Sequence, residues 1–298
     1  MTAWRLAGIS GRSLVADWRF GRYAAHAETN LFASCFEPAS ILAGVPFFGD
    51  DRVATLGLPG KPQRTFFEAA WHRLSGCRRV SPAEALRAIQ EGRDVGGRAI
   101  LLDDCIPDWS MPLEEARQFL SALRPKPQIA EAVRKFRASL GGSPIIGLHV
   151  RHGNGGDIMA HARYWTSFDD ALGRCVRAVA AARELLGEQA NVFLCTDSQD
   201  VEKALAARIP RLLSRPKLYR YPGEGELHRW RFAGLTFADA LTEMLLLAEG
   251  DILIRYPPGS FFSFYGAVMK RRQRSELRLV NDLLISWDPS DPLSPALS

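Results

Sequence analysis

The sequence predicts an α/β protein of two domains, and three observations carry this prediction. Apolar, β-rich runs alternate with amphipathic helical segments through the second half of the chain. One such run, residues 145–151, leads into a glycine-rich loop, and open parallel sheets bind ligands beyond strand ends of this kind. Two prolines within residues 124–127 make a stiff break in the chain. We therefore expect an N-terminal domain over residues 1–125 and a C-terminal domain over residues 126–298.

The elements of the first domain are short and weakly patterned. A helix that stops at Gly8 or Gly11 opens the chain, and Ser81 is placed to cap a later helix. The expected elements are a strand over 13–18, apolar segments over 42–48 and 53–56, a helix over 82–90, a strand over 98–102 and a helix over 113–123.

The second domain alternates more regularly. Its expected helices cover 128–140, 167–187, 198–206, 237–249 and 260–270, and its expected strands cover 145–151, 191–196, 217–221 and 251–256. Strands that alternate with helices form right-handed βαβ units, so these strands should lie parallel in one sheet.

Composition narrows the class of protein. A chain of 298 residues that is 47% hydrophobic is sufficient to build a substantial core. The net charge of +5 is mild, and the basic cluster at residues 270–274 is too short for a nucleic-acid-binding tail. We interpret this cluster as a solvated helix face, with contact to an anionic membrane surface as the alternative. The sequence has neither a secretory signal nor the run of about 18 apolar residues that spans a membrane, which predicts a cytoplasmic protein.

The cysteines and histidines form no metal-binding pattern. No C-x-x-C pair and no H-E-x-x-H arrangement occurs, so neither a zinc site nor any other metal is expected. The five cysteines lie in apolar contexts and are expected to be reduced core residues: Cys35, Cys77, Cys105, Cys175 and Cys195.

Polar residues at the strand ends are candidates for ligand binding. Arg151 ends a strand, and its guanidinium is a rigid, always-charged fork for phosphate. The alternative is a surface arginine paired with Asp157. Asp197 follows the strand over 191–196, where it would either hydrogen-bond a ribose or sugar hydroxyl or cap the next helix.

The helix over 237–249 carries a carboxylate in an apolar setting. Glu243 precedes a run of apolar residues, so it must either pair with a cation such as Arg255 or face a cleft. Thr236 and Asp239 fit a capping box at the start of the same helix.

The start of the last helix combines a hydroxyl with two aromatic rings. Ser260 as N-cap would leave backbone N–H groups facing the sheet edge, where they suit an anion. Phe261 and Phe262 either pack in the core or stack on a nucleobase.

Residues 149–157, His-Val-Arg-His-Gly-Asn-Gly-Gly-Asp, resemble the H-x-R motif of the α-1,6-fucosyltransferases, and among these the rhizobial nodulation enzymes. The resemblance extends over most of the chain and keeps the same order in both halves. It includes residues 15–19, 36–38, 44–46 and 50–53 in the first half, and 193–197, 255–258, Ser260 and Phe262 in the second.

This resemblance implies a GT-B-like fold of two Rossmann-like domains, with GDP-fucose held by the C-terminal domain. It implies transfer to a glycan hydroxyl, in α-1,6 linkage to an N-acetylglucosamine-type acceptor, with inversion and with no metal or cofactor. Arg151 would contact the diphosphate, and Asp157 and Glu243 are the candidates for the base. The implied donor-binding residues are His149, His152, Asn154, Gly155, Asp197, Ser260, Phe261 and Phe262.

The start of the chain departs from the family pattern. The family's N-terminal domain opens with a strand and a glycine-rich loop, whereas Met1 to Arg5 match the middle of its first helix. We therefore expect an N-terminal domain that lacks its first strand, either because the start codon is placed too late or because the protein is degenerate. A glycine-rich segment in frame upstream would support the late start.

Two other functions compete with this one. Residues 150–153 also resemble the R-H-G signature of histidine phosphatases, in which His152 would be phosphorylated and His161 or His228 would be the second histidine. A non-catalytic module that binds a nucleotide sugar or a glycan is the other alternative, and binding of GDP without transfer would indicate it.

Overall fold

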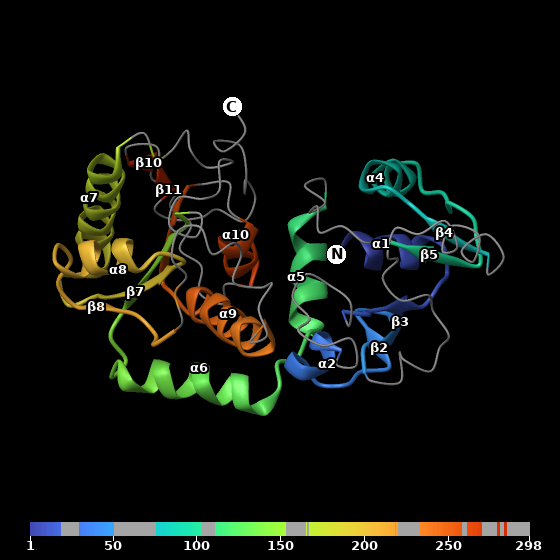
Figure 1. Ribbon diagram of the computed structural model, residues 1–298, viewed down its shortest axis with the longest axis horizontal. Coiled ribbons are helices and arrows are strands. Elements are labelled where there is room, and N and C mark those ends of the chain that lie inside the picture. The colour runs from blue at the N-terminus through green and yellow to red at the C-terminus, as the bar shows by residue number, and fades with distance from the viewer. Residues whose placement is uncertain are drawn as a thin grey trace. The chain divides into compact units, whose positions relative to one another are not determined.

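The chain forms two compact units, Met1–Lys126 and Pro127–Ser298 (Figure 1). The computed structural model describes residues 1–18, 30–50, 76–102, 111–152, 165, 167–217, 219, 233–257, 261–269, 279–280 and 283–284. Within these ranges, no helix is both long enough and apolar enough to cross a membrane.

A parallel sheet of four strands organises the second unit. Its strands are β6 (Ile145–Val150), β7 (Asn191–Thr196), β8 (Leu212–Leu213) and β9 (Ile252–Tyr256), in the order β8-β7-β6-β9. Every residue of β6, β7 and β9 is buried, as expected for strands covered on both faces. The prediction of a parallel α/β sheet is confirmed.

Helices cover both faces of this sheet (Figure 1). On one face, α7 (Phe168–Leu186) and α8 (Gln199–Ala206) share a core with alternate residues of β6, β7 and β9. The other face meets α6, α9 and α10: the ring of Phe136 in α6 lies 5.1 Å from Phe193 in β7, and Leu247 of α9 packs against Gly147. These three helices and the small antiparallel pair that follows are α6 (Pro127–Ser139), α9 (Ala233–Ala248), α10 (Phe261–Val268), β10 (Leu279–Val280) and β11 (Leu283–Leu284).

Two local predictions for this unit are wrong. The fourth strand lies at Leu212–Leu213, and Lys217 and Tyr219 lie outside any strand, because Lys217 turns inward to Glu243. The capping box is also wrong, since α9 already begins at Ala233 and places Thr236 inside its first turn. Asp239 instead forms an ion pair with Arg215 at 3.3 Å.

The first unit is built from shorter elements. β1 pairs in parallel with β3, β2 pairs antiparallel with β3, and β4 pairs in parallel with β5. The elements are α1 (Thr2–Ile9), β1 (Leu14–Val15), α2 (Leu31–Cys35), β2 (Ile41–Leu42), β3 (Val45–Phe48), β4 (Cys77–Arg79), α4 (Pro82–Gln90), β5 (Ala99–Leu101) and α5 (Leu113–Ala122).

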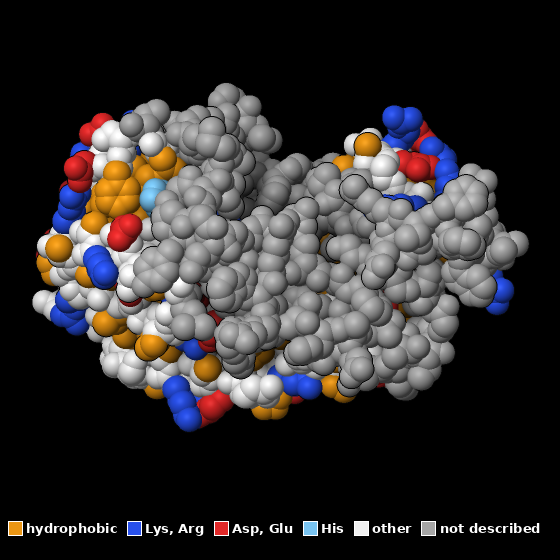
Figure 2. All heavy atoms as spheres, in the orientation of Figure 1, with side chains coloured by type: hydrophobic (Ala, Val, Ile, Leu, Met, Phe, Trp, Pro, Cys, Tyr) orange, Lys and Arg blue, Asp and Glu red, His pale blue; other side chains and the backbone are white. Residues whose placement is uncertain are grey.

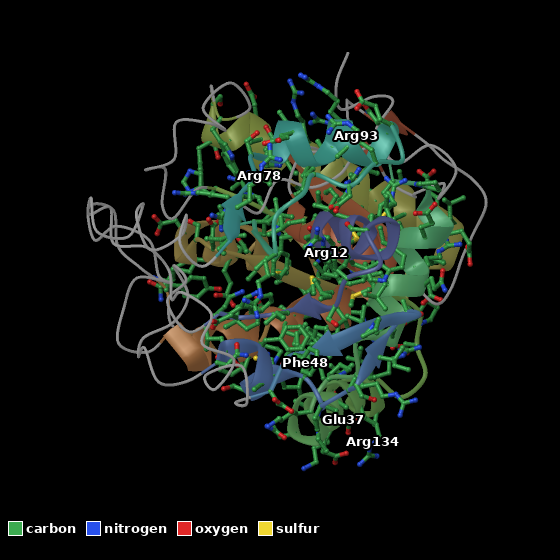
Figure 3. All side chains as sticks on the ribbon, turned by 90° about the vertical axis from the view of Figure 1, so that its right-hand side faces the viewer. Arg12, Glu37, Phe48, Arg78, Arg93 and Arg134 are labelled. Atoms are coloured by element: carbon green, nitrogen blue, oxygen red, sulfur yellow. The ribbon has the colours of Figure 1, made fainter. Side chains whose placement is uncertain are left out.

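Arginine side chains form hydrogen bonds with the loop between α4 and β5. Arg12, which follows α1, donates to the Asp94 carboxylate at 2.7 Å, and Arg78 of β4 donates to the carbonyl of Val95. Arg78 also pairs with Glu84 of α4 at 2.5 Å. Figure 3 shows Arg12 beside α1, and Arg78 and Arg93 beside α4.

Asn30 joins three pieces of the first unit through a fully buried amide. Its Oδ1 accepts from the backbone N–H groups of Trp18 and Phe32, and its Nδ2 donates to the carbonyls of Ala16 and Gly49. One side chain therefore fixes the exits of β1 and β3 and caps α2.

The four cysteines within the described ranges carry free thiols. Cys35, Cys175 and Cys195 are buried core residues as expected, whereas Cys77 is only half-buried because β4 lies in a two-stranded sheet.

Candidate functional site

The carboxyl end of the parallel sheet brings polar side chains from three strands onto one face. Register pairs His149 of β6 with Cys195 of β7 on one side and with Arg255 of β9 on the other. Residues paired in this way point to the same face of a sheet. Here it is the face covered by α9 and α10, because Glu243 contacts Cys195 and Phe262 stacks on His149. We call Cys195, His149 and Arg255 the strand-end row.

Arg151 lies just beyond this row, at the end of β6. Its backbone N–H donates to the carbonyl of Tyr256 at 2.7 Å, which continues the β6–β9 ladder. The β6–β7 register, extended by one residue, places Arg151 opposite Asp197, and Arg151 Nη1 lies 3.1 Å from Asp197 Oδ2. The Arg151 side chain is 32% exposed. Its guanidinium is therefore anchored by Asp197 and also faces solvent. Its ion-pair partner in the structure is thus Asp197.

The peptide bond between Arg151 and His152 is held at both of its polar atoms. Trp165 Nε1–H donates to the Arg151 carbonyl at 3.0 Å, and the His152 N–H donates to Asp197 Oδ1 at 2.8 Å. The chain therefore leaves β6 in a fixed direction, which also fixes the base of the Arg151 side chain. Sequence patterns do not reveal Trp165, because only the fold brings it to a carbonyl 14 residues upstream.

His152 packs against the aromatic side chains of this loop. Its ring centroid lies 4.4 Å from that of Trp165 and 5.5 Å from that of Phe168, and Nδ1 lies 3.2 Å from Ser198 Oγ. Figure 2 shows hydrophobic side chains gathered at the surface near α7. Burial lowers the pKa of His152, so a neutral imidazole helps to shape the loop.

Asp197 anchors the β6 exit and does not cap α8. Ser198 is the N-cap, since its Oγ accepts from the Val201 N–H at 3.4 Å. The capping interpretation of Asp197 is therefore wrong by one residue. The Asp197 side chain is 9% exposed, and each of its oxygens faces a group at the end of β6.

Glu243 lies in a buried polar cluster with Lys217 and Cys195. Lys217 Nζ donates to Oε1 at 2.6 Å, and Cys195 Sγ donates to Oε2 at 3.2 Å. The side chains of Lys217 and Glu243 are only 11% and 8% exposed. The cation that pairs with Glu243 is thus Lys217 and not Arg255, and sequence patterns miss it because Lys217 arrives from an irregular segment after β8.

Burial changes the protonation behaviour of this cluster. Burial, followed by the charge of Glu243, raises the pKa of Cys195 well above its ordinary value, so the thiol stays protonated and donates. Burial alone would lower the pKa of Lys217, but the carboxylates of Glu243 and Glu202 more than offset this and raise it. At neutral pH Lys217 is therefore an ammonium and Cys195 a neutral thiol.

His149 is a neutral imidazole in the middle of the strand-end row. Burial, followed by the charge of Arg151, lowers the pKa of His149 from 6.5 to about 3. The residue is 3% exposed and its ring stacks on Phe262, with 5.2 Å between centroids. Its Nδ1 has no hydrogen-bond partner in the part of the chain that the structure describes.

Several sequence-predicted residues lie outside the described ranges or have side chains that are not described. They are Asn154, Gly155, Asp157, Phe261 and Ser260, together with His161 and His228 of the phosphatase alternative. The described residues include no group of three or more histidine, cysteine, aspartate or glutamate side chains that could hold a metal ion.

Fold and site together define an α/β protein with a Rossmann-like parallel sheet, whose strand ends present an anchored arginine suited to an anionic ligand. Within that class, the chain belongs to the nodulation protein Z (NodZ) family, whose model matches residues 1–282. It is 33% identical to nodulation protein Z of Bradyrhizobium diazoefficiens, with 97% of this chain and 77% of the relative covered. It is 34% identical to nodulation protein Z of Sinorhizobium fredii, with 97% and 88% covered. The resemblance seen in residues 149–157 is confirmed.

Solved structures of this family resemble the fold. A NodZ α-1,6-fucosyltransferase soaked with GDP-fucose is 28% identical to this chain and has a TM-score of 0.65. The match covers 90% of this chain and 86% of the solved chain. A NodZ α-1,6-fucosyltransferase co-crystallised with GDP is 28% identical to this chain and has a TM-score of 0.64. This match covers 89% of this chain and 84% of the solved chain. This likeness confirms the fold class predicted from the sequence.

Proposed function

We propose that this chain transfers fucose from GDP-fucose to a glycan hydroxyl, forming an α-1,6 linkage to an N-acetylglucosamine-type acceptor, with inversion and without a metal. Membership of the NodZ family supports the reaction, and the relatives solved with GDP-fucose and GDP support the donor. The observation in this chain that carries the proposal is Arg151, a partly exposed cation fixed at the strand end.

Arg151 has the chemistry that a departing nucleotide requires. As the bond between fucose C1 and the diphosphate oxygen breaks, both electrons leave with GDP and negative charge grows on the diphosphate. A preorganised cation stabilises that charge without having to reorganise during the reaction. Asp197 orients the Arg151 guanidinium through Nη1. The hydrogen bonds to both polar atoms of the Arg151–His152 peptide bond fix the backbone at the base of this side chain.

The acceptor hydroxyl attacks C1 from the face opposite the diphosphate and gives up its proton to a carboxylate. Glu243 fits this role less well than Asp157, because Lys217 and Cys195 already engage both of its oxygens. We therefore assign the base to Asp157 and assign Glu243, with His149, to the donor pocket.

The remaining assignments follow the family pattern. The second unit would bind the donor through His152, Asn154, Gly155, Asp197, Ser260, Phe261 and Phe262, and the first unit would bind the acceptor. A cytoplasmic location and a peripheral membrane contact through the basic residues 270–274 are the least specific parts of the proposal.

A binding experiment combined with a turnover experiment tests this function. We expect calorimetry to detect binding of GDP and of GDP-fucose. We expect a transfer assay on chitooligosaccharide to yield fucosylated product at the same rate with and without EDTA. Binding without transfer would identify a nucleotide-sugar-binding module instead. A protein that binds neither GDP nor GDP-fucose would overturn the proposal.

A further inference from the structure

Arg255 is a buried cation that has no counter-charge among the residues that the structure describes. The residue is 1% exposed and is the largest of the fully buried side chains in the described ranges. Neither Nη1 nor Nη2 has a hydrogen-bond partner within those ranges. Burial lowers the pKa of Arg255 to about 10, which still leaves the guanidinium charged at neutral pH. An unpaired buried charge destabilises a fold strongly, so its presence calls for a function.

Three other buried or half-buried cations of this unit have partners, although Nε of Arg183 has none within the described ranges. Arg183 of α7 donates through Nη2 to the carbonyls of Ala190 and Pro210. Lys217 pairs with a carboxylate, and so does Arg151. Within the described ranges, Arg255 therefore differs from these cations because both Nη1 and Nη2 lack a partner, and not in burial alone.

Two of the three cations at the described strand ends are paired with carboxylates. The cations are Arg151, Lys217 and Arg255, whereas the carboxylates are Asp197 and Glu243. Within the described ranges, Arg255 is thus the strand-end cation that has no carboxylate partner. Because it is buried, solvent and salt screen it far less than a surface charge.

Register places the Arg255 charge diagonally beneath Arg151, on the neighbouring strand. Arg255 pairs with His149, and Arg151 follows His149 by two residues on the same face. A rise of about 3.3 Å per residue and a strand spacing of about 4.8 Å put the Cα atoms of Arg151 and Arg255 about 8 Å apart. A diphosphate held by the exposed guanidinium would therefore lie within the field of the buried one.

We propose that Arg255 is the buried half of an anion site, whose positive charge acts from beneath the strand ends on a phosphate-bearing ligand held at Arg151. The exposed arginine makes the contact, and the buried one strengthens the attraction through a region of low dielectric. The identification of the ligand as a nucleoside diphosphate rests on the proposed function, whereas the anion site itself does not.

Arg255→Met is the direct test, because it removes the charge and nearly preserves the volume. Loss of an unpaired buried ion should raise Tm by about 2–4 °C. Affinity for GDP and for inorganic pyrophosphate should fall together, by about 10- to 100-fold, as expected for one charge acting over this distance. Calorimetry with guanosine, which carries no phosphate, should show no difference between variant and wild type.

Arg183→Met is the matched control, since Arg183 is also a buried arginine but its guanidinium donates through Nη2 to two backbone carbonyls. It should lower Tm and leave the GDP and pyrophosphate affinities unchanged. Arg255→Lys keeps a charge at the same place and should retain GDP and pyrophosphate affinity within a few-fold. If the methionine variant fails to fold, this lysine variant shows whether charge or shape matters.

Equal affinity of Arg255→Met and wild type for both phosphate ligands would overturn the inference while leaving the proposed function intact. A ten-fold or larger loss with Arg255→Lys would also overturn it, because shape would then matter more than charge. Binding of pyrophosphate that depends on Arg255, in a protein that does not bind GDP, would support the anion site and contradict the proposed donor.

Discussion

His149 and Arg151 share one face of β6 but lie at different depths. Two residues along a strand are about 6.6 Å apart. That distance leaves His149 3% exposed in the core and the Arg151 side chain 32% exposed at the edge. An imidazole can lose its proton on burial whereas a guanidinium keeps its charge, so a neutral ring lies beneath a permanent cation. The order of these two residue types along the strand therefore suits an anionic ligand at its end.

Arg151→Lys should reduce kcat/KM for GDP-fucose about 100-fold, because a point charge does not reproduce the fork that Asp197 orients. Steady-state kinetics measures this change. Arg134→Lys on α6, at a surface arginine paired with Glu131, is the control and should leave the kinetics unchanged. Near-normal turnover of Arg151→Lys would show that the arginine has no special role.

Trp165→Phe should weaken GDP binding several-fold, because it keeps an aromatic ring but removes the N–H that holds the Arg151 carbonyl. The lost hydrogen bond should also cost about 1 kcal/mol of stability. Phe168→Leu alters the same aromatic cluster without touching that bond and serves as the control. If both variants lose stability but bind GDP as the wild type does, Trp165 has only a structural role.

At the scale of elements, Asn30 connects β1, β3 and α2 through four hydrogen bonds. Asn30→Ala would leave several buried backbone groups unpaired, so we expect a loss of about 2–4 kcal/mol in the unfolding free energy of the first unit. Urea unfolding followed by tryptophan fluorescence measures it.

Ser34→Ala provides the comparison for Asn30→Ala, since Ser34 Oγ makes a single long bond of 3.4 Å to the Asn30 carbonyl. It should cost less than about 0.5 kcal/mol. Similar losses in the two variants would show that the Asn30 amide does not connect the three elements as inferred.

Elements with local signals were predictable from the sequence. Ser81 and Pro82 start α4, and the structure gives that helix the expected bounds, Pro82–Gln90. The long apolar run of β7 likewise has the expected bounds, Asn191–Thr196. β8 was not predictable, because two residues are too few for any periodicity and its pairing with β7 is a tertiary contact.

At the scale of the whole molecule, His149 makes stability depend on pH. Its pKa is about 3 in the folded protein, whereas the ordinary value for a histidine, which applies in the unfolded chain, is 6.5. Between these values the unfolded chain binds the extra proton, so the unfolding free energy falls as pH drops from 6.5 toward 3. Each pH unit in this window contributes about 1.4 kcal/mol, which amounts to about 2 kcal/mol at pH 5.

His149→Leu should lack this acid-dependent component. Urea unfolding of both proteins at pH 7 and pH 5 should therefore show a larger loss in the wild type, by about 2 kcal/mol. The same loss in both proteins would mean that His149 does not stay neutral in the folded state.

The sequence indicated which strand end matters but not what surrounds it. Residues 145–157 marked the exit of a buried strand, and Arg151 was identified from that local pattern. Trp165 and Lys217 gave no such signal, because each acts through residues distant along the chain, and the sequence indicated Arg255 only as a partner of Glu243 and within the family resemblance. For the same reason, Glu243 pairs with Lys217 and not with Arg255, the cation named for it from the sequence.

By itself, the sequence determined the α/β class, the parallel strands of the second half and the family, because apolar periodicity and residue order are properties of the chain. Only the tertiary structure decided which charges meet. Strand register aligned Arg151 with Asp197 and set Arg255 beside His149, while an irregular segment brought Lys217 to Glu243. Electrostatic energy depends on distance and burial, and both are fixed only when the strands and helices pack together.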